Sequence, residues 1–305
     1  MPTSQDVDRS GGPPVLAVDL GGTRMRAAVV DGSGLVLDRC AQPTPHDTQD
    51  PDALIALAAD VLRRRPVAAA VVGVPGRVNY ERGELEHAPN LPASWVASLT
   101  EATLSDLLGV PVALANDADM AAVGETVFGA GRGFADVVYV TISTGVGAGV
   151  VLGGRLVHGS RSLAEIGHTV IDRRAVVDHR PATVEALAAG PALARHAAAL
   201  GLDAAGADLV ALIEEDDRAR RTWADGVRVA GLAVANLAHL FAPEVFVVGG
   251  GVSRAGEKLL APIRDVLAEF GPRGHAQPLV VAAALGDDAG IVGAAGWRSA
   301  HLRLS

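Results

Sequence analysis

The sequence is poor in aromatic residues and cysteine, and it is nearly free of lysine. Aromatic side chains make up 3% of the 305 residues, too few for the stacking platforms of proteins that bind single-stranded nucleic acid. The single cysteine, Cys40, allows neither an intramolecular disulfide nor a zinc site built from thiolates. Lys258 is the only lysine and follows Glu257, so the Gly-Lys-Ser/Thr end of a P-loop is absent. These absences exclude P-loop chemistry and disfavour a Schiff-base lysine.

The charge balance is acidic, and long apolar runs are missing. The formal net charge is −9, which disfavours a polyanionic partner such as nucleic acid. No uncharged apolar stretch has the length of a membrane span, and the N-terminal residues lack the apolar run of a signal peptide. We therefore expect a cytoplasmic protein without nucleic-acid or membrane partners.

The length and the apolar patterns predict two α/β domains. Hydrophobic residues make up 49% of the chain, enough for large cores, and 305 residues suit about two domains. Buried strand patterns alternate with helical patterns, which favours mostly parallel sheets with ligands beyond the strand carboxyl ends. We expect a disordered tail over 1–14, a small N-terminal domain over 15–118 plus about 289–305, and a large C-terminal domain over 119–288.

Two strand–turn–strand segments, VLAVDLGGTRMRAAVV and VVYVTISTGVGAGVV, resemble each other in layout. Glycine in such a turn lets the backbone approach a ligand, and its N–H groups can point at phosphate oxygens. Asp19 is placed to hold Mg²⁺ through water. Either turn alone also fits an ordinary hairpin, but the pair predicts a duplicated domain with two phosphate-binding turns. Their residues are Gly21, Gly22 and Thr23 in one turn and Thr144, Gly145 and Gly147 in the other.

A third glycine cluster follows the apolar strand EVFVV. Gly249, Gly250 and Gly251 could belong to a dinucleotide fingerprint, but Arg254 stands where that fingerprint needs glycine. The better functional interpretation is a glycine step against which a purine ring lies flat.

The glycine turns and several further motifs make the chain resemble the ROK sugar kinases (repressor, open reading frame, kinase) of the actin-like ATPase superfamily. The resemblance runs from about Val15 to the C-terminal helix and implies two actin-like (ribonuclease H-like) α/β domains with an active-site cleft between them. The motifs that carry it are DLGGT (19–23), GVPG (73–76), PNLP (89–92), NDAD (116–119), STGVGAG (143–149), EIGH (165–168), VEALAAG (184–190), PEVFVVGGGVS (243–253) and LGDDAGIVGAA (285–295).

The resemblance implies transfer of phosphate from ATP, with Mg²⁺, to the 6-hydroxyl of a hexose. It makes Asp117 the catalytic base, because a carboxylate at a strand end can accept the proton of a hydroxyl that attacks the γ-phosphorus. Capping of the following helix is the alternative role for Asn116 and Asp117, and a Glu-x-x-His pair is more often a surface pair. The implied sugar-binding residues are Gly76, Asn90, Asn116, Asp117, Glu165, His168 and Glu185.

One departure from the family concerns zinc. In most members the histidine precedes a cysteine-rich loop that holds structural zinc, whereas TVIDRRAVVDHRPATVE (169–185) has no cysteine. Asp178 and His179 cannot recreate a closed thiolate tetrahedron, so we expect no zinc site. Four apolar side chains are expected to be buried in place of the metal: Val170, Ile171, Val176 and Val177. A second departure, Asp119 where the family commonly has Asn, has no role that follows from the sequence.

The resemblance leaves the substrate open. Zinc-free relatives in GC-rich bacteria include kinases of amino-sugar intermediates in antibiotic biosynthesis, and the arginine, alanine and glycine bias here resembles GC-rich coding. Glucose or an amino-glucose such as kanosamine is therefore expected, with an N-acetylhexosamine as the alternative. A sugar-responsive regulator is disfavoured, because such members carry a helix-turn-helix domain ahead of DLGGT, where 18 residues stand here. The resemblance also implies a homodimer.

Overall fold

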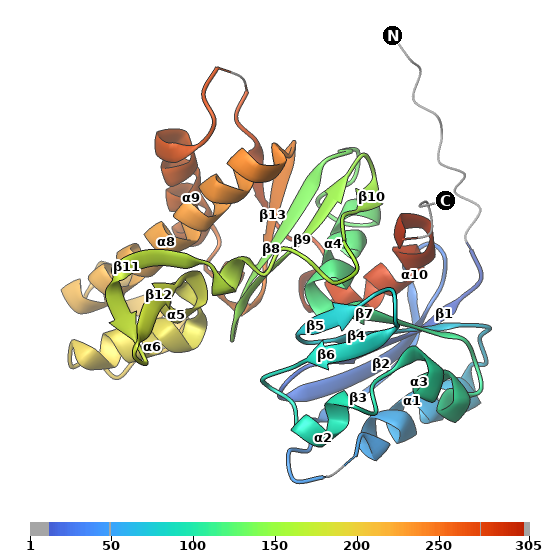
Figure 1. The fold of residues 1–305 in the computed structure, drawn as a ribbon. Coiled ribbons are helices and arrows are strands. Elements are labelled where there is room, and N and C mark those ends of the chain that lie inside the picture. The colour runs from blue at the N-terminus through green and yellow to red at the C-terminus, as the bar shows by residue number, and fades with distance from the viewer. Residues whose placement is uncertain (1–11, 49, 275, 302–305) are drawn as a thin grey trace. The chain divides into compact units, whose positions relative to one another are not determined.

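A computed structural model describes residues 12–48, 50–274 and 276–301 of the chain. Most of the predicted tail, residues 1–11, lies outside the described residues. The chain forms two compact units, which are considered separately (Figure 1). Unit 1 contains the described residues of Met1–Phe128, His158–Ser162 and Asp288–Ser305, and unit 2 contains those of Gly129–Val157 and Leu163–Asp287.

A five-stranded sheet in the order β3-β2-β1-β4-β7 forms the centre of unit 1. β1 is antiparallel to β2 and β2 to β3, whereas β1, β4 and β7 are parallel. The carboxyl ends of these three parallel strands therefore lie at one edge of the sheet. The strands are β1 (Val15–Leu20), β2 (Arg24–Val30), β3 (Val36–Pro43), β4 (Ala70–Val74) and β7 (Val112–Asn116).

Helices and a small hairpin surround this sheet. The side chain of Thr100 caps the start of α3, and Gly109 ends the helix in the left-handed conformation. The remaining elements of unit 1 are α1 (Asp52–Arg64), the hairpin β5 (Arg77–Asn79) and β6 (Glu84–His87), α2 (Ala93–Val96), α3 (Glu101–Leu108), α4 (Asp117–Val127) and α10 (Ala289–His301).

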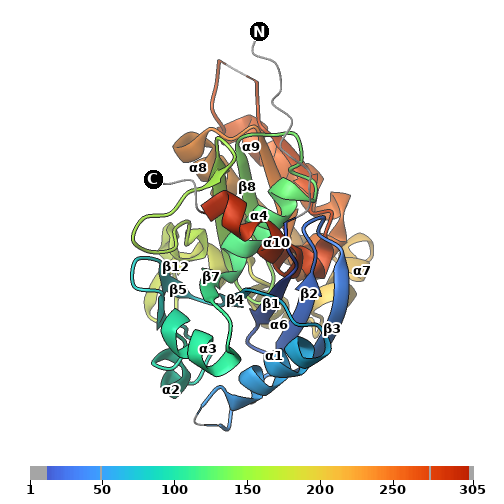
Figure 2. The ribbon, with the colours of Figure 1, turned by 90° about the vertical axis from the view of Figure 1, so that its right-hand side faces the viewer.

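The predicted domain boundary after residue 118 falls inside α4. This helix packs along α10, as Figures 1 and 2 show. The two backbones approach so closely that a Cβ atom at Gly124 would lie 2.2 Å from the Ala289 carbonyl oxygen. Because α10 packs on β1 and β2, the whole of α4 belongs to unit 1, which ends at Phe128 before the chain enters unit 2.

The short segment His158–Ser162 returns to unit 1. Its Ser160 carbonyl accepts a hydrogen bond from the Tyr80 backbone N–H at 2.9 Å. Arg161 Nε donates to Glu86 Oε2 at 2.5 Å. The hydrogen bonds from Arg161 and Asn79 lower the pKa of Glu86 to about 2, so this segment is tied to β6 by a charged pair.

Unit 2 repeats the sheet of unit 1. Its strand order is β10-β9-β8-β13-β14, with two antiparallel pairs followed by two parallel pairs. The equal order agrees with the predicted duplication, and both units are α/β. The strands are β8 (Val137–Ile142), β9 (Val146–Leu152), β10 (Arg155–Leu156), β13 (Val245–Gly249) and β14 (Leu279–Ala282).

The helices of unit 2 pack on one apolar face of its sheet. The longest of them, α8, contributes Trp223, Val227 and Val234 to the core. The other elements are the 3₁₀ turns η1 (Ile166–His168), η2 (Leu212–Glu214), η3 (Gly251–Ala255) and η4 (Gly286–Asp288), the hairpin β11 (Val170–Val177) and β12 (Arg180–Thr183), and the helices α5 (Val184–Ala188), α6 (Gly190–Ala199), α7 (Gly206–Ala211), α8 (Asp217–Phe241) and α9 (Glu257–Phe270).

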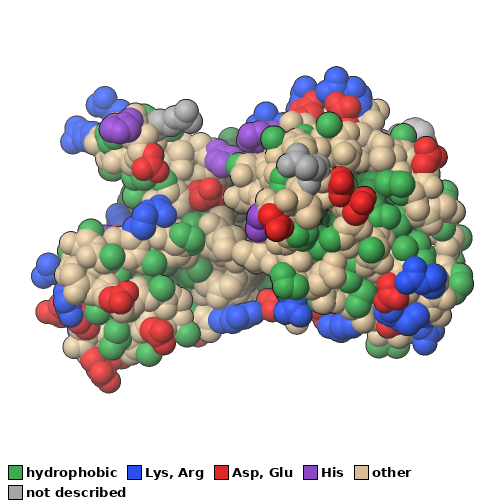
Figure 3. Space-filling view, turned by 90° about the horizontal axis from the view of Figure 1, so that it is seen from below, with side chains coloured by type: hydrophobic (Ala, Val, Ile, Leu, Met, Phe, Trp, Pro, Cys, Tyr) green, Lys and Arg blue, Asp and Glu red, His purple; other side chains and the backbone are tan. Residues whose placement is uncertain are grey.

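The surface in Figure 3 carries acidic and basic side chains interspersed over the visible face. Among the described residues, no helix combines the length and the apolar character needed to cross a bilayer.

Candidate functional site

The predicted site residues of unit 1 gather at the carboxyl edge of its parallel strands. Asp19 lies near the end of β1 and the Gly21–Thr23 turn follows it, Gly76 follows β4, and Asn116 ends β7 with Asp117 directly after it. Asn90 comes from a separate loop and lies beside the first turn, because a Cβ atom at Gly22 would be 3.4 Å from the Asn90 Cβ. The tertiary structure thus brings four separate segments together at one edge.

Asp19 is paired with Arg26, a residue that the sequence did not identify as part of the site. The two lie opposite each other in the β1–β2 register. Arg26 Nε donates to Asp19 Oδ2 at 3.0 Å, and Arg26 Nη1 lies 3.8 Å from Asp288 Oδ1. The carboxylate expected near Mg²⁺ therefore has a cationic neighbour that orients it. Arg26 could be identified only from its position opposite Asp19 on the neighbouring strand. That position depends on the register of β1 and β2, which the motif alone does not specify.

Asn116 caps α4, the role that was the alternative to sugar binding. Its Oδ1 accepts hydrogen bonds from the N–H groups of Ala118 at 2.9 Å and Asp119 at 3.1 Å. Its Nδ2 donates to the Gly76 carbonyl at 2.9 Å. Gly76 has φ +99°, and a Cβ atom there would lie 2.1 Å from the His87 carbonyl oxygen, so only glycine fits. Asn116 thereby links the start of α4 to the loop after β4.

Asp117 is the first residue of α4, and it is exposed. Its Oδ1 accepts a hydrogen bond from the Ala118 N–H at 2.8 Å. The N-terminus of a helix favours a negative charge, and the Asn116 cap fixes the backbone on either side. An exposed, oriented carboxylate at this position can accept a proton from a bound hydroxyl.

In unit 2 the β8–β9 turn lies against the third glycine cluster. The turn closes through a 2.8 Å hydrogen bond from Ser143 N–H to the Gly145 carbonyl, and the Ser143 carbonyl accepts another from Gly190 N–H at 2.8 Å. Gly250 has φ +84°, and a Cβ atom there would lie 2.5 Å from the Ile142 carbonyl oxygen. The two predicted nucleotide-binding segments of unit 2 are therefore neighbours, with Gly147 following in β9 opposite Thr141.

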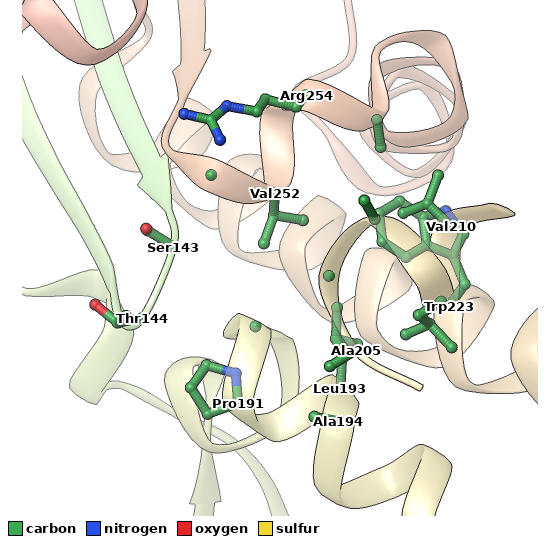
Figure 4. A pocket seen from close by; sticks show the side chains of 16 residues that line it. Ser143, Thr144, Pro191, Leu193, Ala194, Ala205, Val210, Trp223, Val252 and Arg254 are labelled. Atoms are coloured by element: carbon green, nitrogen blue, oxygen red, sulfur yellow. The ribbon is translucent and has the colours of Figure 1, made fainter. Parts of the chain in front are cut away.

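A cavity of about 530 Å³ opens beside these glycine segments. Ser143 and Thr144 lie at one side of it and Val210 and Trp223 at the other, as Figure 4 shows. Trp223 Nε1 donates to the Lys258 carbonyl at 2.9 Å, which fixes the indole. Apolar side chains form most of the wall: Pro191, Leu193, Ala194, Leu209, Val210, Trp223, Val252 and Ala255.

Such a cavity suits a planar base with a polar extension. Apolar walls bind the faces of a ring, and backbone N–H groups of the adjoining turn can bind phosphate oxygens. Of this cavity the sequence identified only the glycine segments and Thr144. The wall comes from α6, α7, α8 and η3. In the sequence, the apolar residues of these elements cannot be distinguished from ordinary core residues.

The predicted sugar ligands of unit 2 surround the start of β9. Glu165 Oε2 lies 3.9 Å from His168 Nε2, and the His168 side chain is 61% exposed. Glu185 Oε2 accepts a hydrogen bond from the Val146 N–H at 2.9 Å. A Cβ atom at Gly167 would lie 2.0 Å from the Val146 carbonyl oxygen. The Glu-x-x-His turn and Glu185 thus converge on one backbone segment.

The segment between His168 and Glu185 contains the β11–β12 hairpin. Its predicted burial is wrong at Val170 and Val176, and Ile171 and Val177 are only half-buried. Val170 is 57% exposed and Val176 is 65% exposed. Among the described residues no other element covers these two side chains, so the hairpin is held instead by its ladder, by Ala182 buried within β12 and by the buried Val184 that follows it. Within the described residues, no group of three His, Cys, Asp or Glu side chains is placed to hold a metal ion.

Comparison with known proteins identifies the relatives of the chain. The sequence model of the ROK family matches residues 15–300. A glucokinase of Streptomyces coelicolor is 34% identical, covering 92% of this chain and 96% of its own. An N-acetylmannosamine kinase of Escherichia fergusonii is 36% identical with the same coverage. A ROK family glucokinase from Streptomyces griseus, solved in complex with glucose and AMPPNP, superposes with a TM-score of 0.79 at 33% identity, over 92% of this chain and 98% of that one.

Proposed function

The chain belongs to the ROK family, and on that premise we propose that it transfers the γ-phosphate of ATP to the 6-hydroxyl of a hexose. The observation that carries the proposal is Asp117, an exposed carboxylate fixed at the first position of α4 by the Asn116 cap. A sugar kinase needs such a group at a strand end, where it can accept the proton of the attacking hydroxyl.

In this proposal the predicted sugar ligands of each unit bind hydroxyl groups of the acceptor. Asp117 accepts the proton of the 6-hydroxyl. Asn116 Oδ1 caps α4 and its Nδ2 donates one N–H to the Gly76 carbonyl, so the second N–H of Nδ2 is the group that would bind a sugar hydroxyl. Glu165 and His168 lie close enough to share one sugar. The full set of proposed sugar ligands is Gly76, Asn90, Asn116, Asp117, Glu165, His168 and Glu185.

ATP binds with its base in the 530 Å³ cavity of unit 2. The base lies against the step formed by Gly249, Gly250 and Gly251, and the phosphates meet the β8–β9 turn. Gly21, Gly22 and Thr23 supply the second phosphate turn. Asp19 offers the carboxylate oxygen that Mg²⁺ prefers, with Arg26 holding that carboxylate in place. Bound Mg²⁺ would neutralise charge on the phosphate oxygens.

Catalysis in this proposal is mostly alignment. The protein positions the 6-hydroxyl and the γ-phosphorus in line. As the new oxygen–phosphorus bond forms, Asp117 accepts the hydroxyl proton, the bond from the γ-phosphorus to the β–γ bridging oxygen breaks, and ADP leaves. The glycine turns place N–H groups where negative charge resides on the phosphates. No covalent intermediate with the protein is required.

The proposed acceptor is glucose or an amino-glucose such as kanosamine. The Streptomyces coelicolor relative is a glucokinase, which supports an unmodified hexose. The N-acetylmannosamine kinase relative at 36% identity supports an N-acetylhexosamine as the second candidate.

A panel of acceptors tests the proposed function. We expect ATP turnover, measured by coupled ADP release, to depend on added sugar and to be greatest with glucose or 3-amino-3-deoxyglucose. N-acetylmannosamine and N-acetylglucosamine are the competing arms, and 6-deoxyglucose is the control, because it lacks the accepting hydroxyl. Activity confined to the N-acetyl sugars would select the second candidate, and phosphorylation of 6-deoxyglucose would exclude transfer to the 6-hydroxyl.

We expect the protein to work without zinc. The hairpin over 170–183 has no cysteine, and its ladder and the buried Ala182 and Val184 hold the segment before Glu185. Protein purified without a metal-affinity tag should contain substoichiometric zinc, and chelation followed by Mg²⁺ addition should restore full activity. One tightly bound zinc per chain, with activity lost on its removal, would contradict this expectation.

A further inference from the structure

A buried carboxylate lies in the same helical turn as the proposed catalytic base. Asp119 is 1% exposed in the first turn of α4, two residues after Asp117. Burying a carboxylate costs free energy unless it is well bonded. Asn116 already caps the helix with its side chain, so Asp119 is not needed as a second cap. Its burial therefore calls for another partner.

That partner is Tyr80, which follows β5. The Tyr80 hydroxyl donates to Asp119 Oδ2 at 2.6 Å. Burial and the nearby Asp119 carboxylate raise the pKa of Tyr80 well above its usual value, so the phenol keeps its proton and remains the donor. A short bond from a neutral hydroxyl to a buried carboxylate is of the strong, charge-assisted kind.

The two side chains close a ring of hydrogen bonds around the start of α4. The Tyr80 oxygen accepts from the Asn116 backbone N–H at 3.2 Å, and the Asp119 backbone N–H donates to Asn116 Oδ1 at 3.1 Å. The ring thus fixes residues 116 and 119 relative to each other. Asp117 lies between them, so its backbone orientation is set by the ring.

The ring is anchored to other segments of unit 1. The Tyr80 backbone N–H donates to the Ser160 carbonyl at 2.9 Å. The Tyr80 ring meets the His158 ring edge to face, with centroids 5.0 Å apart, and it lies 6.2 Å from the Trp297 ring of α10. The phenol therefore cannot move without disturbing its contacts to the segment His158–Ser162 and to α10.

From this geometry we infer that Tyr80 and Asp119 are positioning residues for phosphoryl transfer, which hold Asp117 in the orientation that accepts the sugar proton. Neither side chain touches the substrate in this role; both act through the backbone of residues 116–119. The inference rests on the proposed function of Asp117 as the base. It assigns a role to Asp119, which the sequence left without one, and to Tyr80, which no motif marks.

Steady-state kinetics of four single variants test the inference. Tyr80→Phe and Asp119→Ala each break the ring, so we expect kcat to fall by about 10-fold to 100-fold, the cost of a small misplacement of a reacting group. The KM for sugar should change by less than about 3-fold, because sugar binding is not the function lost. Asp119→Asn should recover most of the turnover lost in Asp119→Ala, since its amide oxygen still accepts from Tyr80.

The fourth single variant, Val61→Ala, is the stability control. Val61 is fully buried in α1 of unit 1 and lies outside the proposed site. We expect it to lower the melting temperature while kcat stays within about 2-fold of the wild type, so loss of stability by itself is excluded as the cause. A fall in kcat for Val61→Ala equal to that of Tyr80→Phe at equal melting temperature would overturn the inference.

A double variant separates this inference from the proposed function. If Tyr80 acts through Asp117, adding Tyr80→Phe to Asp117→Asn should cause no further loss of kcat. Normal turnover in Asp117→Asn would overturn the proposed base and this inference together. An inactive Asp117→Asn beside folded Tyr80→Phe and Asp119→Ala variants with normal kcat would overturn the inference alone. An additional 10-fold loss in the double variant would also overturn it.

Discussion

Asp117→Asn is expected to lower kcat by about 100-fold to 10,000-fold, the usual cost of removing a general base, while the sugar still binds. The amide keeps the shape of the carboxylate and can still accept the bond from the Ala118 N–H. It cannot take the proton of the attacking hydroxyl. Coupled ADP release gives kcat, and calorimetric titration with sugar gives the binding constant.

The matched control is Asp106→Asn, the same change at an exposed carboxylate of α3. We expect this variant to retain wild-type kcat, which shows that loss of a surface charge is harmless by itself. Near-normal turnover in Asp117→Asn would remove Asp117 from the mechanism. Lost sugar binding together with lost turnover would show that Asp117 acts as a sugar ligand only, and the base would then be another residue.

Val252→Trp is expected to raise the KM for ATP by about 100-fold, equivalent to about 2.7 kcal/mol of binding free energy. Val252 stands within the cavity between Ser143 and the Val210 side (Figure 4). An indole there occupies the space proposed for the base, and the surrounding wall is built of packed core side chains that cannot retreat. Steady-state titration of ATP at saturating sugar measures the change.

Leu107→Trp provides the comparison, because it adds an indole at a position of α3 that is 56% exposed. It should leave the KM for ATP unchanged. Sugar binding to Val252→Trp, measured without nucleotide, should also be unchanged, since none of the proposed sugar ligands lines this cavity. An unaltered KM for ATP in a folded Val252→Trp variant would show that the base binds elsewhere.

Arg26 and the cavity show where the sequence stopped being informative. The DLGGT motif predicted a turn with Asp19 at a strand end, and the structure has that turn. Its partner Arg26 follows only from the antiparallel register, which places the two residues opposite each other. The cavity wall is even harder to predict from the sequence, because its residues come from separate elements: Pro191, Val210, Trp223 and Val252. Nothing local distinguishes them from core residues.

In the hairpin over 170–183 the sequence pattern predicted burial that the structure does not have. The hairpin's apolar residues predicted burial, yet Val170 and Val176 are exposed because no other layer within the described part of the chain covers that part of β11. A strand pattern specifies which side chains share a face, but burial of that face requires a second element to pack on it.

The α/β class, the duplicated glycine turns, the family and the segments that carry the proposed site could all be predicted from the sequence. These depend on residues close together in the chain, where turn chemistry and apolar periodicity act locally. The tertiary structure decided the Asp19–Arg26 pair, the cavity, and the bond between Tyr80 and Asp119, which are 39 residues apart. Such contacts arise only when strands pair in register and helices pack on them, because the partners' proximity is set by the packing of whole elements and not by their spacing in the chain.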